Sequence, residues 1–79
     1  MTYQWYWDAG GRRGYLPFSP SLNQRLECAH ESFGPKASTS FLNAGTTYVV
    51  VKTRKGWVQQ RESEPGRWRA VVRRKSFLA

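Results

Sequence analysis

The stretch Trp57-Val58-Gln59-Gln60-Arg61, continued by Ser63-Glu64-Pro65-Gly66 and by Arg67-Trp68-Arg69-Ala70-Val71-Val72-Arg73-Arg74, decides the fold. Its two longer runs alternate large or apolar side chains with polar ones, which is the pattern of a β-strand. Pro65 sets φ for the second position of a tight turn, and Gly66 accepts the positive φ of the third position. The sequence therefore predicts a β-hairpin over residues 57–74.

The period of two residues divides the second strand of this hairpin into two faces. These faces are Trp68, Ala70 and Val72 on one side, and Arg67, Arg69, Val71 and Arg73 on the other. Arginines beside a glutamine-bearing strand make a poor core but a good anion site, because a guanidinium group binds phosphate oxygens through two hydrogen bonds. We interpret the hairpin as part of a site for a phosphate-bearing ligand.

Length and composition indicate one small domain. The chain has 79 residues, of which 15% are aromatic, and buried rings compensate for a core of limited size. We place the domain at residues 1–75 and expect residues 76–79 to be a frayed tail. Cys28 is the single cysteine, so an intramolecular disulfide and a zinc cluster are excluded. Without a long apolar run, we expect an intracellular monomer, nuclear or cytoplasmic, that has no membrane partner.

The charge of the chain is strongly positive. The net charge is +8 and the isoelectric point is about 10.4, and nine of the thirteen Lys and Arg residues follow position 50. This bias favours an anionic partner, such as nucleic acid or a phosphorylated small molecule. The alternative is a solvated basic surface that only confers solubility.

The N-terminal third predicts two strands around a glycine-rich loop. Residues 2–8 alternate aromatic and polar side chains and predict a strand. Residues 9–14 form the loop, which lacks the Lys-Ser/Thr pair of a P-loop. Residues 15–18 predict a short strand, and Pro17 places it at the edge of a sheet or at a strand end.

One helix follows, with a single apolar stripe at helical spacing formed by Leu22, Leu26, Ala29 and Phe33. Ser19, Ser21 and Asn23 are alternative N-caps, and Gly34-Pro35 ends the helix. Strands are predicted again at residues 38–42 and 46–51, before a basic loop at residues 52–56. This order of elements predicts an α+β fold in which a strongly bent sheet wraps one helix.

Several short motifs resemble the WWE domain family in their order and spacing. They are Tyr3-x-Trp5-x-Trp7, Pro17-Phe18-Ser19, Leu26-Glu27-x-Ala29, Tyr48, Gln59 and Arg69-x-Val71-x-Arg73. The resemblance covers nearly the whole chain. It implies a mostly antiparallel half-barrel of about six strands around one helix, which recognises the iso-ADP-ribose unit of poly(ADP-ribose) or terminal ADP-ribose. Members occur in ubiquitin ligases and ADP-ribosyltransferases, so ubiquitin-system and ADP-ribosylated proteins are candidate partners.

The chain departs from the family pattern at three places. Tyr15-Leu16 stands where the second family tryptophan is expected, and Ala9 stands where binders often carry a ring. The acidic residue common in the family is missing from Val49-Val50-Val51. These departures leave open a protein-interaction domain whose ligand pocket is degenerate.

The candidate ligand residues combine the resemblance with residue chemistry. Arg69 suits a diphosphate, Gln59 offers a donor and an acceptor, and Tyr48 offers a ring and a hydroxyl. The primary candidates are Tyr48, Gln59, Arg69 and Arg73, and the secondary ones are Trp57, Arg67, Arg12 and Tyr15. We assign Trp5, Trp7 and Trp68 to the core. Glu27 is assigned a structural role, such as pairing with an arginine.

The sequence gives no basis for catalysis. His30 is the single histidine, and the five acidic residues are scattered without paired spacing. We therefore predict a binding module with no catalytic residue, cofactor or metal. Besides ADP-ribose recognition, binding of RNA or single-stranded DNA through basic strands with interleaved aromatic residues remains an alternative.

Overall fold

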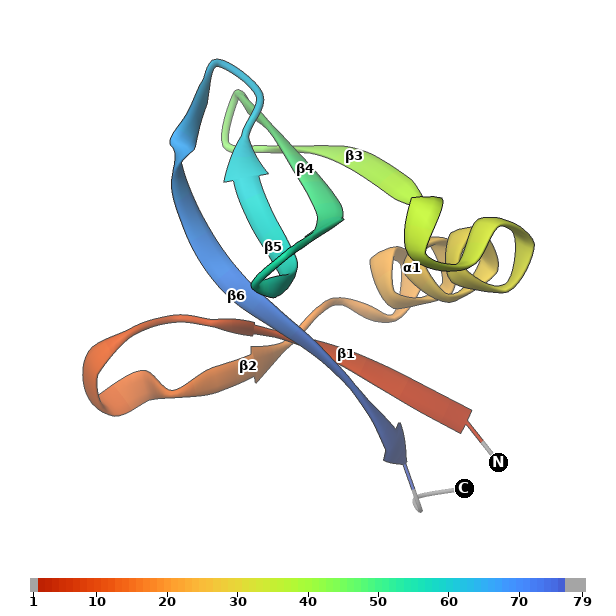
Figure 1. Cartoon of the computed structure of the whole chain (residues 1–79). Helices are drawn as coiled ribbons and strands as arrows, with labels where there is room; N and C mark the ends of the chain where they lie inside the picture. The colour runs from red at the N-terminus through yellow and green to blue at the C-terminus, as the bar shows by residue number, and fades with distance from the viewer. Residues whose placement is uncertain (1, 77–79) are drawn as a thin grey trace.

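The computed structural model describes residues 2–76, and it shows one curled sheet with one α-helix (Figure 1). The strands are β1 (Thr2–Asp8), β2 (Tyr15–Pro17), β3 (Ser38–Asn43), β4 (Thr46–Thr53), β5 (Gly56–Arg61) and β6 (Glu64–Ser76). The helix is α1 (Pro20–Phe33), and two short 3-10 turns, η1 (Gly11–Arg13) and η2 (Gly34–Lys36), complete the described chain. The predicted α+β half-barrel is confirmed.

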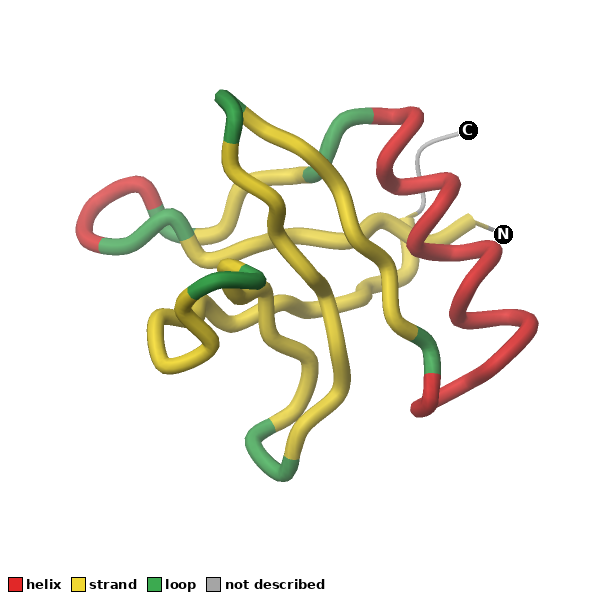
Figure 2. Tube along the Cα trace, turned by 90° about the horizontal axis from the view of Figure 1, so that it is seen from above, coloured by secondary structure: helices red, strands yellow, loops and turns green. Residues whose placement is uncertain are grey.

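The sheet bends because its longest strand changes partners along its length. The strand order is β2-β1-β6-β5-β4-β3, and every neighbouring pair is antiparallel. The first half of β6 pairs with β5 as far as Val71 opposite Trp57. From Val71 opposite Trp7 onward, the second half pairs with β1. In Figure 1, the β1–β2 end of the sheet crosses the lower part of the molecule, the β3–β4 end lies in the upper part, and α1 lies beside them; Figure 2 shows the same curl from above. Pro17 lies in the edge strand, as predicted.

The core lies between the concave face of the sheet and α1. Trp5 and Val50 are each 1% exposed, and Leu26 is the buried residue of the helix. The helix begins after Ser19, whose hydroxyl accepts a hydrogen bond from the Leu22 N–H, and Pro20 occupies the first turn. The predicted stripe is wrong at its end, because Phe33 is 68% exposed where α1 runs past the sheet.

Asn23 connects the helix to β1 and does not act as a cap. Its side-chain oxygen accepts a 2.7 Å hydrogen bond from the Trp5 N–H, and its side-chain nitrogen donates to the Tyr3 carbonyl at 3.0 Å. These two bonds satisfy backbone groups of β1 that the neighbouring strands do not use. They fix the position of α1 along β1.

The turn between β5 and β6 differs from the prediction. The turn residues are Glu62 and Ser63, while Pro65 and Gly66 belong to β6. Arg61 lies opposite Glu64, whereas Gln60 lies opposite Trp68, so residues 65–67 bulge out of the ladder. Proline fits such a bulge because it has no N–H to pair.

One further prediction is corrected at β6. Trp68 does not join the core: it shares the outer face with Gln60 and is 42% exposed. Lys75 and Ser76 pair with Tyr3 and Thr2, so the strand continues into the segment predicted to fray, and residues 77–79 lie outside the described residues. Among residues 2–76, no helix is long and apolar enough to cross a membrane.

Candidate functional site

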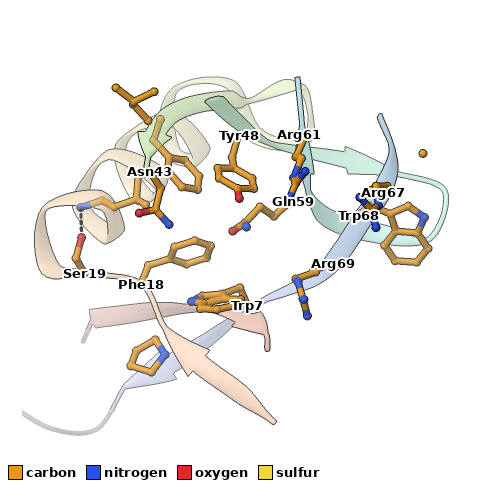
Figure 3. Close-up of a pocket in the computed structure, with 15 residues that line it drawn as sticks. Trp7, Phe18, Ser19, Asn43, Tyr48, Gln59, Arg61, Arg67, Trp68 and Arg69 are labelled. Atoms are coloured by element: carbon orange, nitrogen blue, oxygen red, sulfur yellow. Dashed lines mark hydrogen bonds between the residues drawn. The ribbon is translucent and has the colours of Figure 1, made fainter. Parts of the chain in front are cut away.

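A cavity of about 850 Å³ opens at one end of the half-barrel (Figure 3). Tyr48 from β4, Gln59 from β5 and Arg69 from β6 all line it. Three neighbouring strands thus bring together residues that are far apart in the sequence. The three central site residues of the sequence prediction share one concavity.

Strand register explains why these side chains converge. Gln59 lies opposite Arg69 on one side and opposite Val50 on the other, and side chains that are directly opposite in antiparallel strands share a face. Val50 is buried in the core, so this face is the concave one. Tyr48 lies two residues before Val50 and therefore points to the same side.

Stacked aromatic rings form one wall of the cavity. Tyr48 stacks on Phe41 with ring centroids 5.6 Å apart and an interplanar angle of 20°. Phe41 in turn meets the edge of Phe18 at 6.1 Å. In Figure 3 the Tyr48 hydroxyl and the Gln59 amide point toward Phe18 and Trp7 across the space. Among residues 2–76, neither polar group takes part in a side-chain hydrogen bond, so both are available to a ligand.

Arg69 stands at the mouth of the cavity and is held by the glycine loop. One of its guanidinium nitrogens donates a 3.0 Å hydrogen bond to the Asp8 carbonyl. The Asp8 carboxylate accepts a 2.8 Å hydrogen bond from the Gly10 N–H, which shapes the loop beside that carbonyl. The remaining guanidinium donors are free to meet an anion.

Arg61 and Arg67 add positive charge to the same lining. The bulge at residues 65–67 carries Arg67 to the edge of the cavity. Glu64 lies 3.8 Å from Arg61 and 3.5 Å from Arg67, and all three side chains are largely solvent-exposed. One carboxylate facing two guanidinium groups leaves the rim positive. This rim suits a phosphate-bearing ligand.

Arg73 lies outside the cavity, although it was predicted as a primary ligand residue. Its guanidinium group donates to both carboxylate oxygens of Glu27, at 2.8 and 2.6 Å, and lies 3.5 Å from the Tyr3 ring centroid. The Trp5 indole N–H also donates to Glu27, at 2.9 Å. These hydrogen bonds lower the pKa of Glu27, and the bonding to Arg73 is the largest cause. Burial of the carboxylate opposes the shift. The same pair raises the pKa of Arg73. The group is a structural ion pair between α1 and β6, as expected for Glu27.

The secondary candidates are divided among three places. Arg67 lines the cavity. Trp57 packs edge-on against Trp5 at 5.2 Å, and both Trp57 and Tyr15 line a second, shallower depression. Arg12 lies exposed in η1 and lines neither space.

Sequence reasoning missed the aromatic part of the site. Trp7 was assigned to the core, and it does pack against the buried cluster, but it also lines the cavity. Phe18 and Phe41 belong to the wall that supports Tyr48. Phe41 lies opposite Tyr48, and the signal available in the sequence was that the strands predicted at residues 38–42 and 46–51 follow one another closely.

Residues 2–76 contain no cluster of three His, Cys, Asp or Glu side chains that would hold a metal ion. A search of curated proteins found no match to the chain. The family model described as the WWE domain matches residues 3–74. With the half-barrel around one helix and a match over nearly its whole length, the chain belongs to the WWE domain family.

Proposed function

We propose that this chain is a non-catalytic binding module for an ADP-ribose-type ligand, either the iso-ADP-ribose unit of poly(ADP-ribose) or terminal ADP-ribose. The observation that carries the proposal is the convergence of Tyr48, Gln59 and Arg69 on one cavity. Its volume of about 850 Å³ falls within the range of small-molecule sites, roughly 300–1,000 Å³. Membership in the WWE family supports a binding role.

The geometry supports a different role for each residue of the cavity. Arg69 at the mouth, assisted by Arg67, faces the diphosphate, because guanidinium groups bind phosphate oxygens through paired, charge-assisted hydrogen bonds. Gln59 binds an adenine edge or a ribose hydroxyl, since its amide both donates and accepts. The Tyr48–Phe41 stack supplies the apolar surface against which a ring packs, and the Tyr48 hydroxyl donates to the ligand.

The setting in a larger protein extends this proposal. A module of this kind would serve a ubiquitin ligase or an ADP-ribosyltransferase in the nucleus or cytoplasm by recruiting ADP-ribosylated proteins. Loss of that recruitment in cells on replacement of Arg69 would support this assignment.

Calorimetric titration with iso-ADP-ribose, ADP-ribose and ATP tests the proposal. We expect saturable one-to-one binding of an ADP-ribose form. Arg69→Ala should weaken it by roughly 10- to 100-fold, because a hydrogen bond to a charged group contributes about 1.5–3 kcal/mol.

Arg54→Ala is the matched control. Arg54 lies exposed in the β4–β5 turn and lines neither space, so its loss removes the same charge without touching the cavity. Equal weakening by the two substitutions would contradict a specific role for Arg69. Absence of binding by all three nucleotides would contradict the proposed function itself.

A further inference from the structure

A second surface depression, separate from the cavity, lies along β6. Its volume is about 510 Å³, and it shares no lining residue with the cavity. It lies beyond the end of the β5–β6 pairing. The last pair of this ladder is Trp57 opposite Val71, so the later residues of β6 have no strand partner on the β5 side. Ala70 and Val72 contribute small apolar surface, and Tyr15 and Lys55 also line the depression. We call it the β6 trough.

Two pairs of an aromatic ring and a cation flank the β6 trough. The Lys55 ammonium lies 4.9 Å from the centroid of the Trp68 ring. The Arg74 guanidinium lies 5.9 Å from the centroid of the Tyr15 ring. Lys55 and Tyr15 line the trough, whereas Trp68 lines the ADP-ribose cavity, so Lys55 stands between the two spaces.

Both rings are open to solvent. Trp68 is 42% and Tyr15 is 43% exposed. Trp57, which also lines the trough, carries the Lys52 ammonium 5.7 Å from its ring centroid. Of the Trp and Tyr rings that line the trough, Tyr15 is the exposed one, and Trp57 packs against the core.

The charge around the trough has one sign. Among residues 2–76, no Asp or Glu side chain lines it, whereas Lys55 does and Arg74 lies over the Tyr15 ring; Arg73 also lines it, but its charge is paired with Glu27. The chain carries a net charge of +8. A polyanion is therefore attracted to this side, and the polyanion that also presents flat apolar faces is a single-stranded nucleic acid.

We propose that the β6 trough binds single-stranded nucleic acid independently of the ADP-ribose cavity. A base stacks on Tyr15, while Lys55 and Arg74 bind the adjoining phosphates. A duplex fits poorly, because its bases are already stacked on one another and their faces are not accessible. Recognition tolerates sequence, since every base has a face that stacks on an aromatic ring.

Fluorescence anisotropy with a labelled ten-nucleotide RNA, at two or more salt concentrations, tests this inference. Tyr15→Ala should weaken binding by about five- to 100-fold, the range for loss of one stacked base. Lys55→Glu should weaken binding and flatten its salt dependence, because fewer counterions are released.

Two substitutions outside the trough serve as matched controls. Phe33→Ala removes an aromatic side chain that is 68% exposed at the end of α1. Lys36→Glu makes the same charge reversal in η2. Both should change RNA affinity by less than about threefold, whereas a general effect of net charge would make Lys36→Glu as damaging as Lys55→Glu.

The remaining outcomes separate the trough from the cavity. Calorimetric binding of ADP-ribose forms by Tyr15→Ala and Lys55→Glu should equal that of the unmodified chain, and saturating iso-ADP-ribose should not displace the RNA. Any one of four results would overturn the proposal. They are displacement of the RNA by iso-ADP-ribose, equal affinity for a duplex of the same length, an equal loss of affinity in the control variants, and no RNA binding at 50 mM salt.

Discussion

Arg69 depends on the backbone of residues 8–10 for its place at the mouth of the cavity. A Cβ atom at Gly10 would lie 3.3 Å from a guanidinium nitrogen of Arg69, so a side chain there would push against the group that donates to Asp8. Gly10 also has φ +83°, which L residues rarely adopt. The glycine thus serves the site as well as the loop.

Gly10→Ala should weaken binding of the ADP-ribose ligand by several-fold, whereas Gly14→Ala should not. Gly14 also has positive φ, at +63°, but a Cβ there meets nothing within 4 Å. Both substitutions strain the loop by about 1 kcal/mol or more, so both should lower the melting temperature. Calorimetry and thermal unfolding measure the two effects separately. An equal change in affinity would show that loop strain, and not contact with Arg69, matters.

Glu27 is the residue whose charge most affects stability. Glu27→Gln should lower the free energy of unfolding by about 2–3 kcal/mol at pH 7, because it weakens the bonds with Arg73 and Trp5 in a partly buried place. Glu31→Gln, an exposed position one turn later on α1, should cost much less. Urea unfolding of both variants measures the difference, and equal costs would refute the structural role of Glu27.

The same ion pair predicts a pH dependence. The pKa of Glu27 is lower in the folded state than its ordinary value of 4.5, so its contribution is complete above that value. The contribution is lost as the pH falls through the lower, folded pKa. In urea unfolding, the difference in stability between the unmodified chain and Glu27→Gln should therefore begin to narrow as the pH falls below 4.5, and it should close once the pH is below the folded pKa. A gap that stayed constant from pH 7 to pH 3 would contradict this linkage.

At the residue scale, the sequence did not predict that Gln59 shares a face with Arg69, because a turn at Pro65-Gly66 would set Gln59 on the opposite face. A pattern of two residues per repeat was enough to divide β6 into its two faces. It also put Arg73 on the face of Arg69, which is correct for the strand. It could not show that Glu27 of the helix lies against Arg73 and takes up its donors. That competition depends on where α1 crosses the sheet, which is a non-local property.

Among the elements, α1 is fixed to β1 by Asn23 as much as by apolar contacts. Asn23→Ala would leave the Trp5 N–H and the Tyr3 carbonyl without these partners. We expect a loss of about 1–3 kcal/mol, the cost of unsatisfied buried polar groups. Gln24→Ala, at the exposed neighbouring position, should be nearly neutral. Chemical denaturation of the two variants provides the comparison, and a neutral Asn23→Ala would mean that water replaces both bonds.

The β5–β6 connection shows where local signals fail. Pro65-Gly66 predicts a turn, yet it forms part of a bulge and the turn is at residues 62–63. Pro-Gly suits either structure locally, and the register of Trp57 against Val71 in the core decides between them. The bulge matters for function, since it brings Arg67 to the cavity.

For the molecule as a whole, a small core has to serve both stability and the site. Trp5 is 1% exposed and joins sheet, helix and ion pair. Trp5→Ala should cost about 3–5 kcal/mol, which is much of the stability available to a domain of this size. Trp68→Ala should leave the melting temperature within a few degrees, since that ring lies outside the core. Thermal unfolding followed by circular dichroism tests both, and similar losses would contradict the assignment of Trp68 to the surface.

Trp7 contributes both to the core and to the ligand cavity, two roles that the sequence assigned to different residues. It packs against the core cluster and lines the cavity, so Trp7→Ala should reduce both stability and ligand affinity. The number of strands and the single helix followed from periodicity and turn residues. The bend of the sheet was also predicted from the order of the elements, but its cause was not: β6 pairs with β5 along one half and with β1 along the other.

The most direct measurement is a titration of the isotope-labelled domain with iso-ADP-ribose, followed by amide chemical shifts. We expect saturable one-to-one changes centred on Tyr48, Gln59 and Arg69 and extending to residues 8–10, with little change at Glu27 and Arg73. Shifts that do not saturate, or that cluster along the β6 trough and leave Tyr48, Gln59 and Arg69 unchanged, would contradict the assignment of the cavity as the ligand site.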